Sequence, residues 1–357
     1  MEKRQSNFEL LRILCMVLIV GFHMIGQTKM DGCGPEDGIS YYYCIFMGSA
    51  GRLVCNTFVM IGAWFLVDSK FRPERVVNLW VEIFIYSVTI TVICLGIGCE
   101  DAGIVTLVQA FFPIFGRPVW FGAEYICLLL LTPWLNEMLG EKNWHRTRQA
   151  VKLFSVLIIG CATLFPIGHT TPAFSELVWF CFLYLFIGLY KRGQMPVCQK
   201  IEKYSFVCFL LSYLILCSMK IMADVMRIEP LRYLYNYYRG HYEALFGFSC
   251  SFFLFLAFKN WNMGYSRLVN LISRSAFAIY IIHQTPAFYR YMWNGMFQVN
   301  ASVENGNIIG YSLFVTAVIF VACVCIDNIR ILITDKLICK NKLYFMVCQK
   351  LQKFYKM

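Results

Sequence analysis

Long apolar stretches recur along almost the whole chain, and they restrict its fold more than any other feature. Stretches of about 17 to 25 apolar residues are long enough to cross a bilayer as helices, which satisfy their backbone hydrogen bonds internally. Ten such spans are predicted, over residues 10–27, 44–67, 76–97, 119–138, 151–167, 174–190, 204–223, 241–258, 268–289 and 308–333. The chain is therefore expected to be an all-α, polytopic membrane protein with about ten transmembrane helices.

Composition excludes the usual soluble classes. Hydrophobic residues make up 59% and charged residues 15% of the 357, whereas soluble domains are about 45–50% apolar. The longest polar connections, at 27–41 and 223–240, are too short to hold a core of their own. We therefore expect one transmembrane domain over residues 1–335, followed by a basic cytoplasmic tail over residues 336–357.

Basic residues are distributed unequally between the two sets of connections that ten spans create. One set holds six, namely Lys29, Arg117, Arg227, Arg232, Arg239 and Arg290. The other set holds twenty, namely Lys3, Arg4, Lys70, Arg72, Arg75, Lys142, Arg146, Arg148, Lys191, Arg192, Lys200, Lys203, Lys259, Arg267, Lys336, Lys340, Lys342, Lys350, Lys353 and Lys356. Lys and Arg accumulate on the cytoplasmic side, which predicts that both termini are cytoplasmic. The net charge of +11 is therefore attributed to membrane topology, and the expected partner is the lipid bilayer rather than nucleic acid.

Ionisable side chains inside a bilayer are costly and rare, so each one is a candidate site. In the predicted spans they are Arg12, His23, Arg52, Glu82, Glu124, Lys220, Glu243, Arg274 and His283. The spacing of cysteine and histidine matches no zinc motif. No metal site is expected.

Arg12 and His23 form the most informative pair. They are eleven residues apart, almost three turns, so they lie on one stripe of a helix about 16 Å apart along its axis. Arg12 is expected near the cytoplasmic boundary and His23 in the outer half of the membrane. This arrangement suits a substrate whose phosphates stay near the cytoplasm while its reactive end reaches into the bilayer. Alternatively, Arg12 is a cation that sets topology, and His23 makes a structural hydrogen bond to another helix.

His283 and Glu124 are expected at a similar depth. His283 ends an apolar run in the ninth predicted span, and Glu124 lies on the fourth. A second imidazole can pair with His23, and a carboxylate such as Glu124 can orient a histidine. Alternatively, His283 is a packed histidine bonded to a hydroxyl. Arg52 and Glu82 are expected to neutralise one another or another buried group, or else to contact substrate.

Several segments, taken together, resemble one known family. The segments are RQSNFELLR at 4–12 continuing to His23, NTFVMIGAWFL at 56–66 followed by KFR at 70–72, FFPI at 111–114 before Trp120, LLTP at 130–133, and SAFAIYIIH at 275–283. In this order, over nearly the whole chain, they are similar to the acyltransferase family 3 integral-membrane proteins, which O-acylate cell-surface glycans in bacteria. The first segment looks like that family's Arg-x10-His helix.

The resemblance implies a ten-helix domain in the bacterial inner membrane that uses acyl-CoA as donor. It also implies that Arg12 assists CoA binding and that His23 is catalytic. Two segments depart from the family pattern. The usual Ser-Gly-Tyr/Phe reads Ile61-Gly62-Ala63-Trp64 here, and the arginine motif Arg-Arg-x-x-Arg-x-x-Pro is reduced to Arg75. Neither departure touches Arg12 or His23.

Transfer of an acyl group from a thioester to a sugar hydroxyl requires a base for the hydroxyl proton, and His23 is assigned that role. An acyl-imidazole formed on His23 is the second mechanism, and the sequence does not separate the two. Backbone amides, Tyr280 or His283 are options for stabilising the oxyanion. Arg12, Lys70, Arg72 and Arg75 are expected to bind the CoA phosphates, although positive-inside placement alone also explains them.

The expected function is thus O-acyl transfer, acetyl-CoA being the expected donor and a cell-surface or lipid-linked glycan the acceptor. A transporter or flippase that moves a polar or lipid-linked substrate without chemistry is the competing class, because buried charges in ten helices are also typical of transporters. A scaffold in a glycan-assembly complex is the third.

Overall fold

The computed structural model describes residues 5–28, 34–116, 118–166, 175–304, 307–337 and 341–355. The described part of the chain is 81% helical and contains no strand. The expectation of an all-α protein is therefore confirmed. Lys29 and Arg117, predicted as basic residues of the outer connections, lie outside the described residues.

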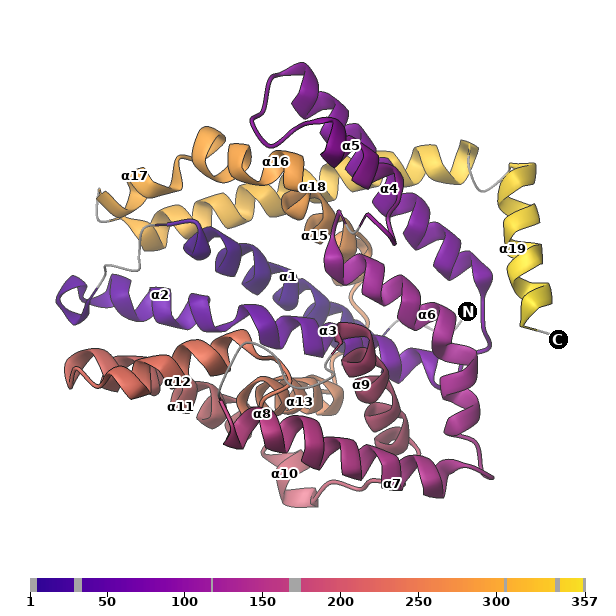
Figure 1. Ribbon diagram of the computed structural model, residues 1–357, viewed down its shortest axis with the longest axis horizontal. Helices are drawn as coiled ribbons and strands as arrows, with labels where there is room; N and C mark the ends of the chain where they lie inside the picture. The colour runs from indigo at the N-terminus through magenta and orange to yellow at the C-terminus, as the bar shows by residue number, and fades with distance from the viewer. Residues whose placement is uncertain are drawn as a thin grey trace.

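Nineteen α-helices follow one another along the described ranges (Figure 1). They are α1 (Ser6–Gly26), α2 (Ile39–Ser49), α3 (Gly51–Leu66), α4 (Pro73–Gly96), α5 (Ile104–Phe111), α6 (Trp120–Met138), α7 (Trp144–Phe154), α8 (Cys161–Leu164), α9 (Glu176–Lys191), α10 (Gln199–Lys203), α11 (Ser205–Val225), α12 (Glu229–Gly240), α13 (Leu245–Asn260), α14 (Arg267–Ile272), α15 (Ala276–Gln284), α16 (Pro286–Arg290), α17 (Val299–Glu304), α18 (Ile308–Leu337) and α19 (Lys342–Phe354).

Six helical segments of the described chain are long and apolar enough to cross a membrane, and a seventh is added if α12 and α13, bent by 48°, form one broken span. The chain is a multi-pass membrane protein. The predicted spans at 119–138 and 174–190 are also helical, as α6 and α9, but neither is among the six. The number ten therefore stays a prediction.

The ninth predicted span, over 268–289, is wrong as one continuous helix. A 3₁₀ turn at Ser273–Ser275 separates α14 from α15, and Thr285 separates α15 from α16. Pro286 is the first residue of α16, and a proline forces the preceding residue into an extended conformation. Thr285 has that conformation, with ψ 120°. As a consequence, His283 and Gln284 lie at the C-terminal end of a short helix.

Two segments predicted as polar connections or tail contain helices of their own. The connection at 223–240 includes α12, and the tail at 336–357 includes α19. Helix α19 packs against α4. The Tyr344 hydroxyl donates to Asn78 Oδ1 on α4 at 2.8 Å, and the Tyr355 hydroxyl donates to the Leu130 carbonyl on α6 at 2.7 Å. Hydropathy did not mark either helix because both carry one apolar and one polar face.

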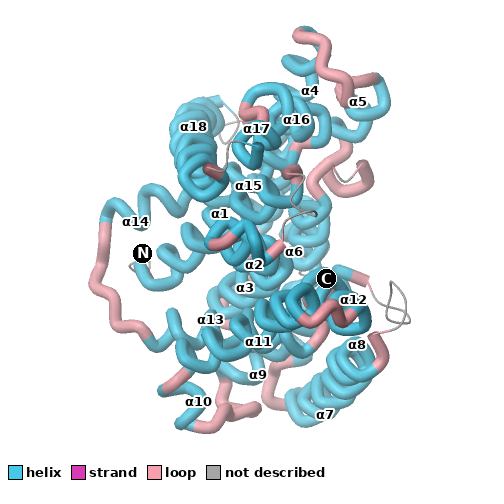
Figure 2. Tube along the Cα trace, turned by 90° about the vertical axis from the view of Figure 1, so that its left-hand side faces the viewer, coloured by secondary structure: helices cyan, strands magenta, loops and turns pink. Residues whose placement is uncertain are grey.

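Helix α1 occupies the centre of the molecule. It packs against α3 and α13 on one side and against α15 and α18 on the other, as Figure 2 shows from the end of the bundle. Its N-terminal end is held by Ser6, whose hydroxyl accepts from the Ser266 amide and from Asn270 Nδ2, both at 2.9 Å. Asn7 Nδ2 donates to the Phe258 carbonyl at 2.8 Å. These contacts fix the position of the helix that carries Arg12 and His23.

The first and last residues that the structure describes lie at the same end of the molecule (Figure 1). The helical pair α2 and α12 reaches the opposite end, together with α17. We refer to these as the N-terminal end and the distal end, and the sequence predicts that they face the cytoplasm and the outside.

Candidate active site

Two histidines from distant parts of the chain meet in the interior. His23 lies in the last turn of α1, and His283 lies near the C-terminal end of α15. Nδ1 of His23 is 3.0 Å from Nε2 of His283, and the ring centroids are 5.2 Å apart. His283 is fully buried and His23 is half-buried. The predicted pairing of the two imidazoles is therefore present in the structure.

The hydrogen bonds of His283 define the tautomers of the pair. Nδ1 of His283 lies 2.5 Å from the Ile279 carbonyl, and a carbonyl only accepts, so Nδ1 carries the proton. In neutral His283, Nε2 is then an acceptor. The His23 Nδ1 proton donates to that acceptor, which leaves the lone pair of the neutral His23 ring on Nε2. Nε2 makes no hydrogen bond with the described residues, so it is available to a substrate.

Gln284 completes the contacts around His23. Its amide nitrogen is placed 2.9 Å from His23 Nδ1. An amide nitrogen only donates, so the His23 tautomer given above requires the Gln284 amide to turn its oxygen toward Nδ1, where it accepts from the same proton as His283 Nε2. Gln27 Nε2 donates to the Tyr289 hydroxyl at 3.3 Å, and the Tyr289 ring stands edge-on to His23 with centroids 6.2 Å apart. These groups restrict the rotation of the imidazole.

Arg52 lies close enough to His23 to interact with it electrostatically. Its guanidinium is 5.7 Å from the Trp120 ring centroid and 5.5 Å from that of Tyr242, which are cation–π distances. It makes no ion pair with the residues that the structure describes. Arg52 is therefore a cation that can stabilise negative charge developing beside His23.

The Tyr280 side chain lies one turn before His283 on α15, with ring centroids 6.2 Å apart. It is buried, and its hydroxyl has no hydrogen-bond partner among the described residues. A buried hydroxyl without a partner is unusual, because its desolvation is not offset. It can donate to a ligand atom that enters the site.

The carboxylates of the predicted site have different surroundings. Glu82 does not face Arg52: it lies 3.5 Å from Arg330 on α18, so it is paired with another buried group. Glu124 is half-buried on α6, one turn after Trp120. The hydrogen bonds of the two histidine rings described above go to each other, to Gln284 and to Ile279. The predicted role of Glu124 as an orienting carboxylate stays a prediction.

Arg12 lies on the α1 stripe that carries His23, and its side chain is 24% exposed. Its guanidinium contacts the Phe65 ring at 5.9 Å. Nη1 also donates to both oxygens of the buried Glu9 carboxylate, at 2.9 and 3.0 Å. The stripe therefore faces protein, but a phosphate that binds Arg12 has to share it with Glu9.

Lys70, Arg72 and Arg75 lie together at the N-terminal end of the bundle. All three line a small cavity between the α3–α4 connection and α6, with an enclosed volume of about 10 Å³. Arg75 Nη1 donates to Ser69 Oγ at 2.9 Å. This cluster makes no ion pair within the described ranges. In its present form the cavity has room for about one water molecule.

Neighbouring cations at the same end are already neutralised. Lys191 Nζ lies 2.7 Å from an Asp68 oxygen, and an Arg192 nitrogen lies 3.5 Å from the other. The hydrogen bond from Lys191 lowers the pKa of Asp68, which keeps this carboxylate charged. Of the four predicted phosphate-binding residues, Lys70, Arg72 and Arg75 thus differ from Lys191 and Arg192 in having no counter-ion among the described residues, whereas Arg12 is paired with Glu9.

Sequence reasoning missed Gln284 and the Ile279 carbonyl. Gln284 directly follows His283, but nothing in the sequence says that it turns toward α1. No group of three or more Cys, His, Asp or Glu side chains among the described residues has the geometry to hold a metal ion.

Comparison with protein families gives one match over most of the chain. The family model described as an acyltransferase domain matches residues 5–327, which include the histidine pair and the Lys70–Arg75 cluster. Comparison with curated proteins and with solved structures finds no match.

Proposed function

The chain belongs to acyltransferase family 3, and from that premise we propose that it is a membrane-embedded O-acyltransferase of the bacterial inner membrane. It transfers an acetyl group from cytoplasmic acetyl-CoA to a hydroxyl of a cell-surface or lipid-linked glycan. The observation that carries this proposal is the contact between His23 Nδ1 and His283 Nε2, because it leaves His23 Nε2 as a base inside a membrane protein of an acyltransferase family.

His23 acts as the general base. The acceptor oxygen attacks the thioester carbonyl carbon while its proton moves to His23 Nε2. The new C–O bond forms, the C–S bond of the tetrahedral intermediate breaks, and the departing thiolate takes the proton back from His23. The products are the acetyl ester and CoA, and His23 returns to its starting state.

His283 and Gln284 position the base. When His23 Nε2 takes a proton, the imidazolium forms on a ring whose Nδ1 proton is already directed at a neutral acceptor, His283 Nε2. A correctly directed acceptor holds the tautomer and stabilises the charge, as the carboxylate does in a serine-hydrolase triad. Here the neutral imidazole of His283, whose own Nδ1 proton is held by the Ile279 carbonyl, takes the role of that carboxylate.

Tyr280 and Arg52 stabilise the oxyanion of the tetrahedral intermediate. Tyr280 contributes a hydroxyl without another partner, and Arg52 contributes positive charge beside His23. Preorganised donors of this kind are worth the most where water is excluded. Both are on the elements that carry or contact the histidine pair, α15 and α3.

The donor binds from the N-terminal end. Its phosphates contact Lys70, Arg72 and Arg75, which lack internal counter-ions, and Arg12 lies between this cluster and His23 along α1. Arginine grips phosphate with two parallel hydrogen bonds. The 10 Å³ cavity has to widen when CoA binds, so donor binding includes a movement of the α3–α4 connection or of the neighbouring α19 segment.

The test is a transfer assay with the full-length protein in nanodiscs. We expect radiolabelled acetyl-CoA and a glycan acceptor to give an acetylated product, and His23→Ala to reduce kcat by about 10²-fold or more, the usual loss when a general base is removed. His145→Ala is the matched control, because His145 is an exposed histidine on α7, and its activity should equal the wild type.

Two results would contradict the proposal. If His23→Ala and the wild type form product at the same rate, His23 is not the base. If no acetyl-CoA is consumed but glycan moves across the membrane of vesicles that contain the protein, the transporter interpretation is correct. Trapping of an acetylated His23 by rapid quench would assign the acyl-imidazole mechanism instead of direct transfer.

A further inference from the structure

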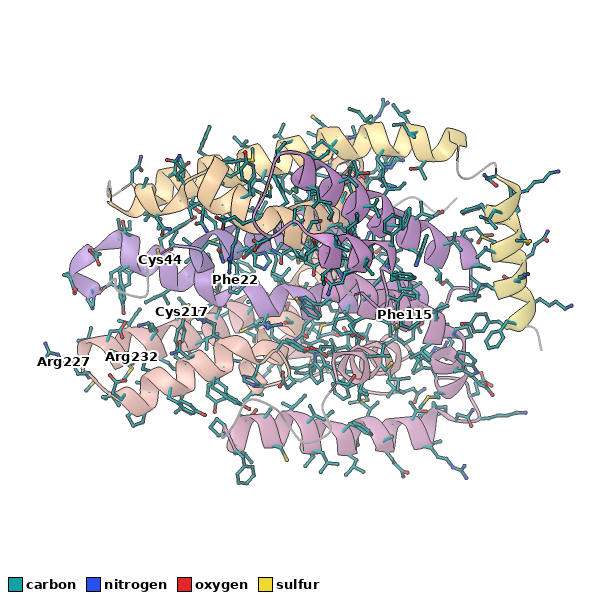
Figure 3. The ribbon with its side chains drawn as sticks, turned by 45° about the horizontal axis from the view of Figure 1, so that its top comes forward. Phe22, Cys44, Phe115, Cys217, Arg227 and Arg232 are labelled. Atoms are coloured by element: carbon teal, nitrogen blue, oxygen red, sulfur yellow. The ribbon has the colours of Figure 1, made fainter. Side chains whose placement is uncertain are left out.

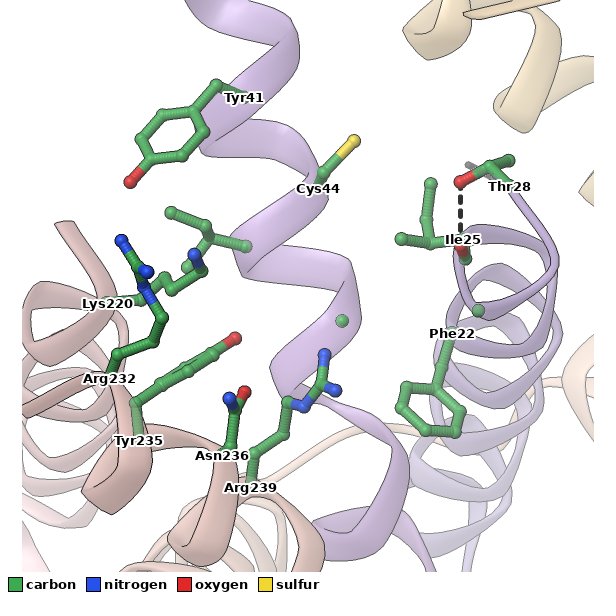
Figure 4. A pocket seen from close by; sticks show the side chains of 13 residues that line it. Phe22, Ile25, Thr28, Tyr41, Cys44, Lys220, Arg232, Tyr235, Asn236 and Arg239 are labelled. Atoms are coloured by element: carbon green, nitrogen blue, oxygen red, sulfur yellow. Dashed lines mark hydrogen bonds between the residues drawn. The ribbon is translucent and has the colours of Figure 1, made fainter. Parts of the chain in front are cut away.

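A cavity of about 510 Å³ lies at the distal end of the bundle, beside the last turns of α1 (Figure 4). It is formed by α1, α2, α11 and α12. Its lining residues include Phe22, Tyr41, Lys220, Arg232, Tyr235 and Arg239. Cavities of roughly 300–1,000 Å³ are the size that small-molecule ligands occupy. The catalytic mechanism described above does not use this cavity.

Three cations line the cavity, and two of them are neutralised by one carboxylate. Lys220 Nζ lies 2.7 Å and an Arg232 nitrogen 3.1 Å from Asp224, which also accepts from the Tyr41 hydroxyl at 2.7 Å. Arg232 is paired a second time, with Glu229 at 2.6 Å. These contacts build one rigid wall.

Arg239 is the third cation, and it differs from the other two. It makes no ion pair with the described residues. Its guanidinium lies 5.7 Å from the Tyr235 ring centroid, and Tyr235 is buried and held by Ser49, whose oxygen is 3.0 Å from the Tyr235 hydroxyl. In Figure 4 the Arg239 guanidinium extends from α12 into the space between α2 and α1. A half-buried arginine held over a fixed ring, without a counter-ion, is ready to bind an anion.

The cavity adjoins the histidine pair. Phe22 lines it, and the Phe22 ring centroid is 5.2 Å from that of His23. Gly26, which also lines the cavity, follows His23 by three residues, so it lies on the same side of α1 about 4.5 Å farther along the axis. A molecule anchored in the cavity can therefore place a neighbouring group close to His23.

We propose that this cavity binds the anionic group of the acceptor, a sugar carboxylate or phosphate, and that Arg239 is its main contact. The acceptor is thus an acidic sugar. Its reacting hydroxyl belongs to the same monosaccharide as the charged group or to the adjacent one. Tyr41, Asn236 and Tyr235 offer hydroxyl, amide and ring surfaces to the remainder of the unit. This inference rests on the proposed function, because it names the substrate class of the same site.

The experiment compares acceptors that differ only in charge. Methyl glucoside is the neutral acceptor, and methyl glucuronoside and glucose 1-phosphate are the acidic ones. The protein is reconstituted in phosphatidylcholine nanodiscs, kcat/KM is measured for each acceptor, and equilibrium binding of each sugar is measured separately by calorimetry without acetyl-CoA.

We expect the wild type to prefer at least one acidic acceptor by about tenfold, the effect of one charge-assisted contact. Arg239→Gln should remove that preference in both assays and leave kcat/KM for the neutral acceptor within about twofold of the wild type. Unchanged use of the neutral acceptor also shows that the variant is folded.

Arg227→Gln is the matched control. Arg227 is exposed at the distal end and does not line the cavity, and Figure 3 shows its side chain directed away from the molecule, beyond Arg232. The preference for acidic sugars should stay the same in this variant. A loss there equal to that of Arg239→Gln would attribute the preference to general surface charge and overturn the proposal.

The remaining outcomes distinguish a failure of the proposed acceptor site from a failure of the proposed acyltransferase function. Equal binding of neutral and acidic sugars, unaffected by Arg239→Gln, overturns the inference even if acetyl transfer occurs. Acidic-sugar binding that depends on Arg239, without any acetyl transfer, supports the site but contradicts the proposed function. If replacing phosphatidylcholine by phosphatidylglycerol displaces the sugars, a lipid headgroup is the occupant, and the assignment to an acceptor is wrong.

Discussion

At the scale of single residues, the proposed chemistry depends on the contact between His23 and His283. One imidazole alone is a flexible base with two tautomers. His283 removes that ambiguity, since its own Nδ1 proton is committed to the Ile279 carbonyl and its Nε2 can only accept. His23 Nε2 then has the lone pair that a general base requires. The nearby charge of Arg52 and the Tyr280 hydroxyl, which has no partner among the described residues, can stabilise the oxyanion.

This coupling predicts the effect of changing His283. His283→Phe keeps the ring volume but offers no acceptor, so His23 loses its fixed tautomer. We expect kcat to fall by about 10²-fold, with the KM for acetyl-CoA within about twofold of the wild type. The double variant His23→Ala, His283→Phe should be no slower than His23→Ala alone, because residues that act as a unit are not additive. Losses that multiply would contradict the coupling.

At the scale of helices, breaks and buried charges determine how the elements meet. The break at Thr285 ends α15 just after Gln284, which directs the end of that helix toward α1. Irregular backbone at membrane depth is tolerated where protein surrounds it. The Glu82, Asp327 and Arg330 group has another effect: it joins α4 to α18, with Arg330 2.7 Å from Asp327 and 3.5 Å from Glu82.

The α4–α18 contact predicts a stability change. Asp327 is fully buried and also accepts from the Tyr86 hydroxyl at 2.8 Å. Arg330→Met leaves buried carboxylates without a cation, and we expect a loss of about 3–5 kcal/mol in the free energy of unfolding, measured by thermal or denaturant unfolding in detergent. Adding Glu82→Gln should recover part of the loss, since it removes one of the two charges.

Arg290→Met is the control for the stability measurement. The Arg290 side chain is 69% exposed and lies 3.6 Å from Asp101, so its replacement should change the free energy of unfolding by less than about 1 kcal/mol. Equal stability of Arg330→Met and Arg290→Met would show that the buried group does not hold α4 against α18.

At the scale of the whole molecule, the sites proposed for donor and acceptor lie toward opposite ends of the bundle. The described ends of the chain lie together, and the Lys70–Arg75 cluster lies at that same N-terminal end, whereas the Arg239 cavity lies at the distal end. His23 is between them. The donor and the acceptor can then approach from opposite ends of the bundle, because α1 runs through the centre and carries Arg12 toward one end and His23 toward the other.

The topology predicts the behaviour of reporter fusions. A fluorescent protein that matures only in the cytoplasm should fluoresce when fused to either terminus, because the more basic connections stay inside. Alkaline phosphatase inserted at residues 34–38, at the distal end, should be active because that reporter requires an oxidising exterior. An active phosphatase at one terminus together with fluorescence at the other would contradict the paired orientation.

Much of the architecture is readable from the sequence alone. Apolar stretches predict helices in a bilayer because burial of their side chains and the internal pairing of their backbone groups are both local properties. The eleven-residue spacing of Arg12 and His23 predicts a shared stripe for the same reason, since the helical repeat is local. The family resemblance, which the match over residues 5–327 confirms, also depends on short linear segments.

Other features are decided only by the tertiary structure. From the sequence, Glu82 is expected to pair with Arg52 or with another buried group, or to contact substrate. The contact between α4 and α18 gives it Arg330 as its partner. Gln284 reaches His23 only because Pro286 ends α15 where α1 passes. In the sequence Arg239 is one more basic residue of an outer connection. Only the packing of α12 together with α1, α2 and α11 places it in the lining of a cavity. Hydropathy and residue spacing describe one segment at a time. Hydrogen bonds and ion pairs are short-range contacts between segments up to 269 residues apart, and only the packing of the helices brings those segments within reach.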